Sequence, residues 1–154
     1  MKFEQEFLSE LLYDPEALLL DELLEVDPER SLVRATLQIT PDLPLTAQQR
    51  THPQRHPRHL AGGLILHATG SLGFVHAYYI LGLRTSEGWT GYGTHIHRAV
   101  FRGLIEPGDR VEAECRATRL RLGAERHVIR YAFDFRRDGK RVYEGDQTAM
   151  WLRI

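Results

Sequence analysis

The sequence predicts a single α+β domain, residues 1–154, in which an antiparallel β-sheet wraps a long central helix. Two observations support this prediction. Residues 64–83 are small or apolar nearly all round, which is typical of a helix buried on most of its surface. Residues 92–154 contain successive segments in which apolar and polar residues alternate, the period of half-buried strands. One apolar helix and one amphipathic sheet would bury each other's apolar faces.

The segments before the long helix are expected to hold a short helix, a strand and a long loop. Residues 8–24 are rich in Leu, Glu and Asp and predict a short helix, followed by Pro15 and an apolar stretch, Leu18–Leu20, that leads into the sheet. Apolar and polar residues alternate along residues 33–39, which predicts a strand. Between Pro41 and His59 lie four prolines and three histidines, a composition typical of a loop, and loops of this length are usually functional.

Four more strands are expected after the long helix, which the pair Gly62-Gly63 opens. They cover residues 92–104, 111–117, 128–135 and 142–154. Pro107-Gly108-Asp109 and Asp138-Gly139 are turn sequences between strands. A sheet of this kind leaves a free edge strand, which a dimer that joins two sheets would cover. We therefore expect a homodimer or a higher homo-oligomer.

Charge and composition exclude several classes of partner. The chain has 20 lysines and arginines and 21 aspartates and glutamates, which gives a net charge of −1. A charge this small produces no field that would attract nucleic acid or an anionic membrane. The single cysteine, Cys115, permits no disulfide within the chain and is expected in the core. The sequence shows no signal-peptide pattern and no apolar run of membrane-spanning length, so the expected location is the cytoplasm.

Three segments of the chain are similar to a known superfamily. They read LLLDELLEVDP at residues 18–28, HPQRHP at 52–57 with GGLIL at 62–66, and FRGLIEPGD at 101–109. In this order and at this spacing they resemble the hotdog superfamily, in particular the 3-hydroxyacyl-acyl carrier protein dehydratases of fatty acid synthesis, which have thioesterases as relatives. The resemblance implies a hotdog fold, acyl thioesters of coenzyme A or acyl carrier protein as substrates, and neither a cofactor nor a metal.

The resemblance also implies where the catalytic residues lie. In the dehydratases a histidine opens a loop motif that ends in His-Pro or Asp-Pro, and here His52 takes that place, with His56-Pro57 after it. A Glu or Asp follows on the first turns of the central helix, but this sequence has His67 there, and the loop between His56 and Gly62 is one residue longer than in the family. The family further implies a pocket at a dimer interface, where the loop of one chain faces the helix of the other.

The chemistry of these substrates assigns a role to each residue. Dehydration of a 3-hydroxyacyl thioester needs a base, an acid, and donors for the developing enolate oxygen. Histidine suits the first role because its pKa lies near neutrality, so we expect His52 as the base and His67 as a substitute acid. In a thioesterase, His67 would instead activate water. The amides of Gly62 and Gly63 would supply donors, because amides at a helix start lack intrahelical partners.

Two arginines are candidates for binding the carrier of the acyl group. Arg98 and Arg102 flank the strand that in the family lines the acyl tunnel and its entrance, so either is suited to a phosphate of coenzyme A or of a carrier phosphopantetheine. The competing interpretation is a solvated charged face.

The histidines have alternative interpretations. His67 is also consistent with a buried, hydrogen-bonded helix histidine in a homologue that has lost catalytic activity. His52 is also consistent with a solvated loop histidine. Five histidines lie either on the loop or two apart on one strand: His52, His56, His59, His95 and His97. Three of them would suffice as ligands of a zinc ion, but no nearby cysteine completes a familiar ligand spacing. Dehydration, hydrolysis and non-catalytic binding of an acyl thioester therefore all remain open.

Overall fold

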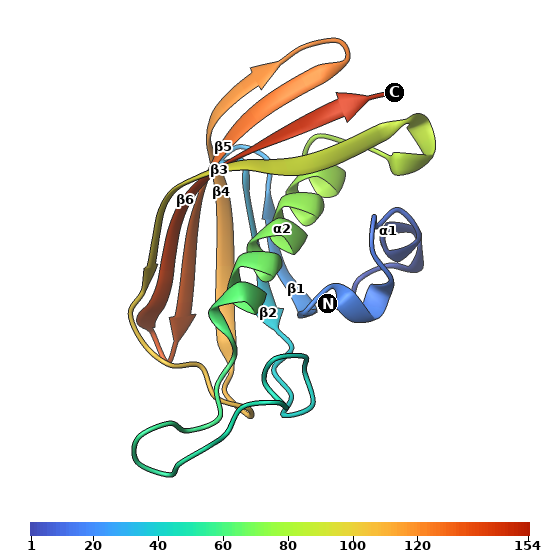
Figure 1. Ribbon diagram of the computed structural model, residues 1–154. Helices are drawn as coiled ribbons and strands as arrows, with labels where there is room; N and C mark the ends of the chain where they lie inside the picture. The colour runs from blue at the N-terminus through green and yellow to red at the C-terminus, as the bar shows by residue number, and fades with distance from the viewer.

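An antiparallel sheet of six strands curves round the long helix α2 (Gly62–Tyr79) in the computed structural model, which describes residues 1–154 (Figure 1). The strands are β1 (Leu20–Asp27), β2 (Leu32–Leu37), β3 (Trp89–Phe101), β4 (Val111–Leu122), β5 (Arg126–Arg137) and β6 (Lys140–Arg153). A short helix, α1 (Gln5–Ser9), lies on the side of α2 that faces away from the sheet. The predicted arrangement of a central helix wrapped by an antiparallel sheet is confirmed.

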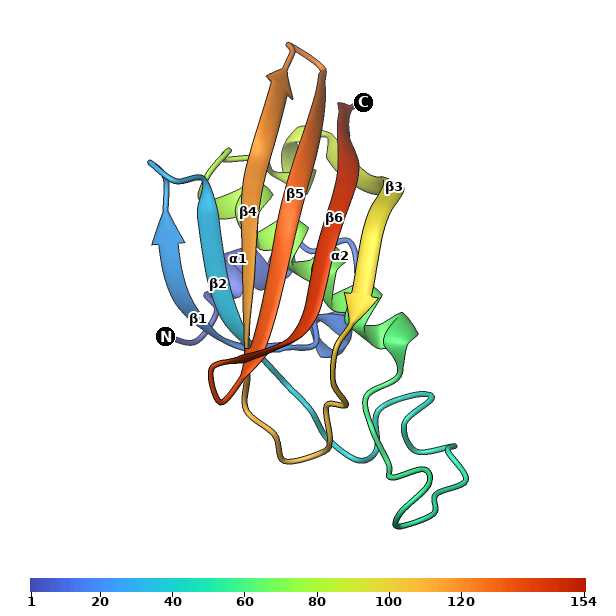
Figure 2. The same cartoon turned by 90° about the vertical axis from the view of Figure 1, so that its left-hand side faces the viewer.

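The strands lie in the order β1-β2-β4-β5-β6-β3 (Figure 2). The first strand after α2, β3, therefore pairs with the last strand of the chain, β6, and not with β4. This pairing places β3 at one edge of the sheet and β1 at the other. We call the sheet face that contacts α2 the inner face and the opposite one the outer face; the outer face is turned toward the viewer in Figure 2.

The core lies between α2 and the inner face of the sheet. On α2 the side chains of Ala68, Leu72 and Val75 are completely buried. Every second residue of the facing strands meets them, among these Val33, Ala35, Val111, Ala113, Cys115, Ile129, Tyr131, Phe133 and Phe135. Removal of these apolar side chains from water is the main force that holds the sheet on the helix. Burial also raises the pKa of the Cys115 thiol, which occupies the predicted core position.

The N-terminal part of the chain differs from the prediction. The short helix is α1, at residues 5–9, and residues 20–27 form a strand of their own, β1. The register of β1 against β2 shifts twice, once on each side of Leu23. These irregularities interrupt the alternation of apolar and polar residues, so the strand carries no clear period-two pattern in the sequence.

Helix α2 is offset from its predicted range. It begins at Gly62 instead of residue 64 and ends at Tyr79 instead of residue 83. Beyond its end the chain turns at Gly82, whose φ of +69° glycine adopts without steric cost, and the amide of Leu83 donates to the carbonyl of Ala77. No helix of the structure combines the length and the apolar character that are needed to cross a bilayer.

A buried histidine links the helix to strand β5 and to the turn between β1 and β2. His76 has no exposed surface, and its ring lies between the Ser31 hydroxyl, 2.8 Å from Nε2, and the Tyr131 hydroxyl, 3.0 Å from Nδ1. Because both hydroxyls either donate or accept, one ring nitrogen of neutral His76 can donate while the other accepts. Burial lowers the pKa of His76 from 6.5 to about 4. The sequence did not indicate hydrogen-bond partners for this histidine, because Ser31 and Tyr131 are distant from it in the chain.

We expect the stability of the fold to fall as the pH is lowered from 6.5 toward 4. The pKa of His76 is lower in the folded chain, so the unfolded chain binds the proton first, and the stability present above pH 6.5 is lost as pH falls toward the folded pKa. The difference corresponds to about 3 kcal/mol at most. Urea unfolding between pH 7 and 5 measures about 2 kcal/mol of this difference. In this range the acidic groups with lowered pKa in the folded chain, such as Glu10 and Glu144, stay ionised there. In His76→Gln the slope should be absent; an unchanged slope in this variant would contradict the assignment.

Candidate functional site

Two cavities meet at the first turns of α2. The first, which we call the α2–β3 groove, has a volume of about 810 Å³ and is open to solvent. Its walls come from α2, from residues 90–96 of β3, from the inner face of β5 and β6, and from Leu12 and Tyr13. The second cavity, of about 610 Å³, lies between the chain before β1, the end of β2 and the start of the long loop. Both volumes are in the range of small-molecule sites.

His67 lies between these two cavities and contributes to the walls of both. Its Nε2 is 2.7 Å from the carbonyl oxygen of Ala17, and because a carbonyl only accepts, Nε2 carries a proton. The ring edge contacts the ring of Tyr13, with centroids 5.0 Å apart. Nδ1 has no partner in the chain. In its neutral form the half-buried His67 therefore presents the lone pair of Nδ1, which is what a general base requires.

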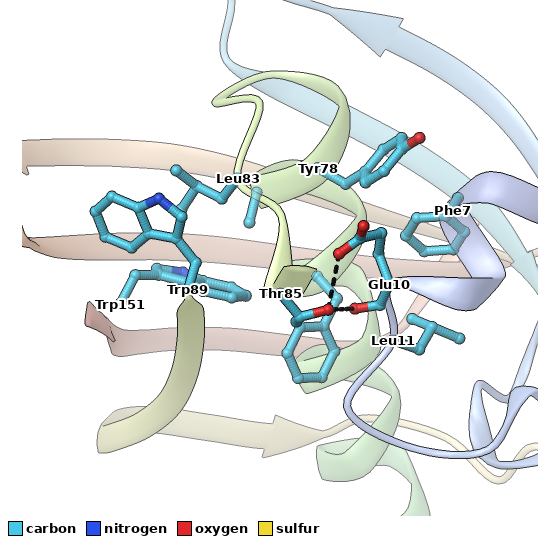
Figure 3. Close-up of a pocket in the computed structure, with 10 residues that line it drawn as sticks. Phe7, Glu10, Leu11, Tyr78, Leu83, Thr85, Trp89 and Trp151 are labelled. Atoms are coloured by element: carbon cyan, nitrogen blue, oxygen red, sulfur yellow. Dashed lines mark hydrogen bonds between the residues drawn. The ribbon is translucent and has the colours of Figure 1, made fainter. Parts of the chain in front are cut away.

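The segment whose Ala17 carbonyl accepts the hydrogen bond of His67 is itself bound to the rest of the fold. Residues 10–17, which we call the N-terminal strap, run from α1 to the carbonyl of Ala17. At its start the Glu10 carboxylate accepts a hydrogen bond from the Thr85 hydroxyl (Figure 3). It also accepts from the amide and hydroxyl of Ser86, and these bonds lower its pKa to about 2. Phe7, just before the strap, is buried against Tyr78 of α2. The strap thus keeps a fixed acceptor beside Nε2 of His67.

His52 lies apart from both cavities in its own chain. The loop of residues 41–61 that carries it projects beyond the end of the sheet (Figures 1 and 2). Its backbone exchanges two hydrogen bonds with His56, and its Nδ1 accepts from the amides of Gln54 and Arg55 at 3.2 and 3.1 Å. Nδ1 is thereby occupied, so Nε2 carries the proton of the neutral ring. Within one chain the structure brings His67, but not His52, to a cavity.

Gly62 and Gly63, which the sequence placed just before the apolar run of the helix, are the first two residues of α2. Their amides donate to no acceptor in the chain, and no side chain caps this end of the helix. A Cβ on Gly62 would lie 3.3 Å from the ring of Phe101, so this glycine lets the helix start approach the end of β3 closely. The free amides leave a site for a negatively charged oxygen.

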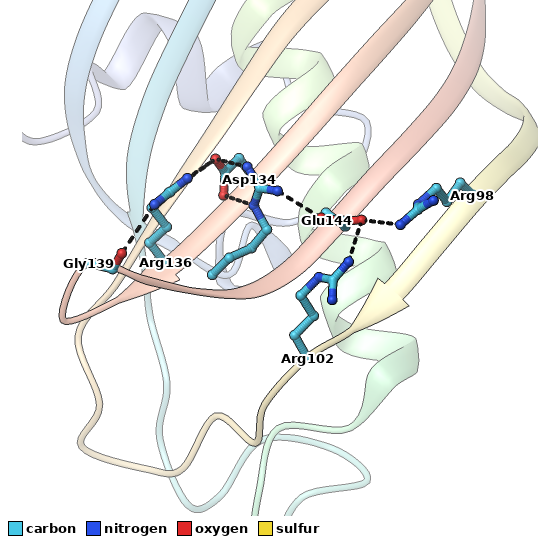
Figure 4. Close-up of polar contacts among 7 residues, drawn as sticks. Arg98, Arg102, Asp134, Arg136, Gly139 and Glu144 are labelled. Atoms are coloured by element: carbon cyan, nitrogen blue, oxygen red, sulfur yellow. Dashed lines mark hydrogen bonds and ion pairs between the residues drawn. The ribbon is translucent and has the colours of Figure 1, made fainter.

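Arg98 and Arg102 lie on the outer face of the sheet, away from α2 and from both cavities (Figure 4). Arg98 is 2.5 Å and Arg102 is 3.0 Å from the same carboxylate oxygen of Glu144, and this pairing lowers the pKa of Glu144 to about 2. Together with Asp134, Arg136 and Arg141 they form one network of four guanidinium groups and two carboxylates. The network has excess positive charge, but it does not border the groove.

The other histidines form pairs, not larger clusters. The rings of His95 and His97 are stacked with centroids 5.6 Å apart, which agrees with the prediction that both lie on one face of the strand. His56 and His59 contact each other on the loop, with centroids 5.1 Å apart. No group of three or more His, Cys, Asp or Glu side chains in the chain is arranged to hold a metal ion, so the histidines considered for zinc do not converge within it.

A polar bridge across the groove was not predicted from the sequence. Tyr143 donates through its hydroxyl to Oε1 of Gln147 at 2.7 Å, and Nε2 of Gln147 donates to the Thr69 hydroxyl of α2 at 3.0 Å. Thr69 and Gln147 both line the α2–β3 groove. The signal in the sequence was a polar residue, Gln147, at an inward-facing position of an otherwise apolar strand face.

Residues 12–146 match the FabA-like domain, which is most of the chain. The chain belongs to the FabA-like family. The resemblance to the hotdog superfamily is thereby confirmed, and so is the predicted fold class. Among curated proteins none matches the chain.

Solved structures with the same fold as this FabA-like chain include enzymes named as thioesterases. A mutant thioesterase of Pseudomonas aeruginosa aligns with a TM-score of 0.58 at 23% identity, over 90% of this chain and 85% of that one. A thioesterase of Haemophilus influenzae aligns with a TM-score of 0.61 at 18% identity, over 99% and 93% of the two chains. AziG of S. sahachiroi aligns at 0.60 and 19% identity, over 90% and 95%. At these identities the likeness establishes the hotdog fold of the FabA-like chain and nothing finer.

Proposed function

We propose that this protein acts on acyl thioesters, and that its reaction is hydrolysis with His67 as the general base. The observation that carries the proposal is the imidazole of His67, which borders two cavities, has its Nε2 proton bound to Ala17, and leaves Nδ1 free. No Asp or Glu lines the α2–β3 groove, but two histidines do, His67 and His95. Nδ1 of His95 is hydrogen-bonded to the Thr94 hydroxyl on the edge strand, whereas Nδ1 of His67 has no partner, so His67 is the better suited of the two to take a proton. The names of two fold relatives, both called thioesterases, agree with this proposal.

We infer a simple sequence of steps. The acyl chain lies in the α2–β3 groove, and Nδ1 of His67 takes a proton from a water molecule, whose oxygen adds to the thioester carbon. The oxygen of the tetrahedral intermediate gains the negative charge, which the free amides of Gly62 and Gly63 stabilise together with the dipole of α2. When the C–S bond breaks, the thiolate takes the proton back from His67. The carbonyl of Ala17 stabilises the transient imidazolium.

A homodimer formed along β3 is part of this proposal. β3 is an edge strand, so its outer backbone groups lack partners, and it carries three large exposed hydrophobic residues, Tyr92, Ile96 and Phe101, with 56%, 55% and 49% of their surface accessible. Such an edge favours pairing with another strand. Two chains paired along β3 would narrow the mouth of the α2–β3 groove and place the projecting loop of each chain, with His52, near the other chain.

A second candidate function is the dehydration of 3-hydroxyacyl thioesters, which the resemblance to the dehydratases favours. The hydrogen bonds at His52 argue for roles opposite to those expected from the sequence. Since Nδ1 of His52 already accepts two amides, its Nε2–H can only donate, which suits protonation of the leaving hydroxide. His67, with its free Nδ1, would then be the base that removes the proton next to the carbonyl. This function requires the His52 of a second chain.

The basic network of Arg98, Arg102, Arg136 and Arg141 is proposed as a contact for the carrier. Its charge suits the phosphates of coenzyme A or an acidic carrier protein. Because the network lies on the outer face, it would bind the carrier outside the groove. Non-catalytic binding of acyl thioesters would use the same groove and the same network.

One experiment separates the three functions. Purified protein is incubated with saturated acyl and 3-hydroxyacyl thioesters of coenzyme A, and the release of free thiol and the formation of the enoyl product are followed in the same samples. Thiol release from both substrates supports hydrolysis. Enoyl formation without thiol release would replace hydrolysis with dehydration, and saturable binding without either product would leave a binding protein. If no thioester binds or reacts, the proposal is wrong.

A further inference from the structure

Two exposed histidines lie side by side on the edge strand β3 (Figure 2). The rings of His95 and His97 are stacked, with an angle of 2° between their planes and centroids 5.6 Å apart. His97 is bonded to Thr148 of β6, and His95 pairs with the same residue in the strand register. Gln147, the neighbour of Thr148, is turned toward α2, so Thr148 lies on the outer face. Both imidazoles therefore project from the outer face of the sheet, beside its edge.

Hydrogen bonds determine which nitrogen of His95 is free. The Thr94 hydroxyl donates to the carbonyl of Thr148, so it can only accept from the imidazole of His95, whose Nδ1 lies 3.0 Å away. Nδ1 consequently carries the proton of the neutral ring. Nε2 of His95 has no partner in the chain, and its lone pair is directed to solvent.

The ring of His97 is held in a corresponding way by its other nitrogen. Nε2 of His97 is 2.6 Å from the Thr148 hydroxyl, which has no other hydrogen-bond partner in the chain and can accept the Nε2 proton. Nδ1 of His97 is then the free nitrogen. Metal-binding histidines usually donate one ring N–H to a protein oxygen and bind the ion through the other nitrogen. His95 and His97 both have this arrangement.

The charged groups around the two rings do not oppose a cation. The nearby guanidinium of Arg98 is paired with Glu144 at 2.5 Å, and that of Arg130 is paired with both carboxylate oxygens of Asp146 at 2.8 and 2.7 Å. Arg130 is the main cause of the lowered pKa of Asp146, and the charge of His97 contributes to it. A carboxylate therefore lies within electrostatic reach of His97.

One chain supplies too few ligands for a stable metal site, but two chains paired along β3 would supply enough. A protein zinc site uses three or four side chains. β3 covers 13 residues, and an antiparallel pair that uses its whole length places the two-fold axis at its middle, beside His95 and Ile96. Side chains opposite each other in such a pair have Cβ atoms about 4.5–5.5 Å apart. The imidazoles of both chains would thus gather on one face around the axis.

We propose that His95 and His97 of two chains together bind a divalent metal ion such as zinc at the two-fold axis of the β3 dimer. The inference rests on the dimer of the proposed function but not on the reaction. Four imidazole nitrogens match the tetrahedral coordination of zinc, and imidazole is also a good ligand for copper and nickel. Because the site is complete only in the dimer, the ion would hold the two chains together.

The test uses zinc chloride and protein that has been freed of metal with a chelator. Isothermal titration should show one zinc ion bound per two chains, which distinguishes a shared site from a site within one chain. Sedimentation equilibrium is then measured with and without zinc. With free zinc at about 100 times its own dissociation constant, the dissociation constant of the dimer should fall by about a hundredfold.

Three variants assign the ligands. His95→Gln and His97→Gln each remove two of the four imidazoles of a dimer and should abolish this binding; both side chains are exposed, so the core is not disturbed. Thr148→Val removes the acceptor that orients His97 and should weaken zinc binding by about 10–100-fold. The matched control is His56→Gln, which breaks the other histidine pair, on the long loop, and should leave zinc binding unchanged.

Each outcome bears on one proposal. Zinc binding that survives in His95→Gln, or that is lost in His56→Gln, would overturn the site. A wild-type dimer that binds no zinc would overturn this inference alone and leave the proposed function intact. A wild-type protein that stays monomeric with and without zinc would contradict the proposed dimer, and the metal site would fail with it. Release of free thiol from acyl coenzyme A, measured in the same samples, tests the reaction separately.

Discussion

Replacement of His67 by alanine is expected to lower kcat for thioester turnover by about 10²–10⁴-fold, the usual contribution of a general base. The reason is that His67 is the titratable group that borders both cavities, with Nε2 held by Ala17 and Nδ1 free to accept a proton. KM should change much less, since the imidazole acts in the transition state more than in substrate binding. Steady-state release of free thiol, or formation of the enoyl product, measures both parameters.

The matched control for this variant is His56→Ala. His56 is an exposed histidine on the long loop and lines neither cavity, so its replacement should leave turnover near the wild-type value. Both variants must unfold at similar temperatures for the comparison to count, because His67 also anchors the strap through Ala17. Turnover by His67→Ala at the wild-type rate would remove His67 from the mechanism, whichever reaction the protein performs.

Replacement of Ile96 by lysine is expected to convert a dimer into a monomer and to lower turnover, the latter also because Ile96 lines the α2–β3 groove. Ile96 lies near the middle of the edge strand β3 and is 55% exposed in the single chain. In an antiparallel β3 pair the two lysines would lie close together across the two-fold axis, and like charges in an interface cost on the order of several kcal/mol. The dimer should therefore weaken by about a hundredfold or more. Sedimentation equilibrium measures the assembly, and the same samples are assayed for turnover.

The control for charge alone is Thr118→Lys on the outer face of β4, in the middle of the sheet, which should keep both the dimer and the activity. A wild-type protein that sediments as a monomer while it turns over thioesters would contradict the proposed interface. An Ile96→Lys variant that remains a dimer would place the interface elsewhere.

The fold followed from local patterns wherever those patterns were regular. The all-round apolar character of residues 64–83 predicted α2, and the alternation along residues 111–117 and 128–135 predicted β4 and β5. β1 escaped prediction because two register shifts beside Leu23 break its alternation. The pairing of β3 with β6 was also out of reach, since it depends on how strands far apart in the chain meet across the sheet.

For the candidate site, residue types were easier to predict than their surroundings. The family pattern pointed to His67, Gly62 and Gly63, and the structure puts the histidine in the wall of two cavities and the two amides free at the start of α2. The same reasoning pointed to Arg98 and Arg102 as binding residues, but it did not predict that both form ion pairs with Glu144. It missed Gln147, because a single glutamine in a strand has no distinguishing pattern until Thr69 and Tyr143 are seen on either side of it.

The sequence by itself determined that one apolar helix lies against an amphipathic sheet and that a histidine occupies position 67 on the second turn of that helix. These features are local, since they depend on the spacing of apolar residues and on residue identity along a few turns or strands. Only the tertiary structure decided that β3 is an edge strand, that Nδ1 of His67 is its unoccupied nitrogen, and that the arginines lie on the outer face. Each of these depends on contacts between residues that are distant in the chain, such as Ala17 with His67, and such contacts exist only once the core has formed.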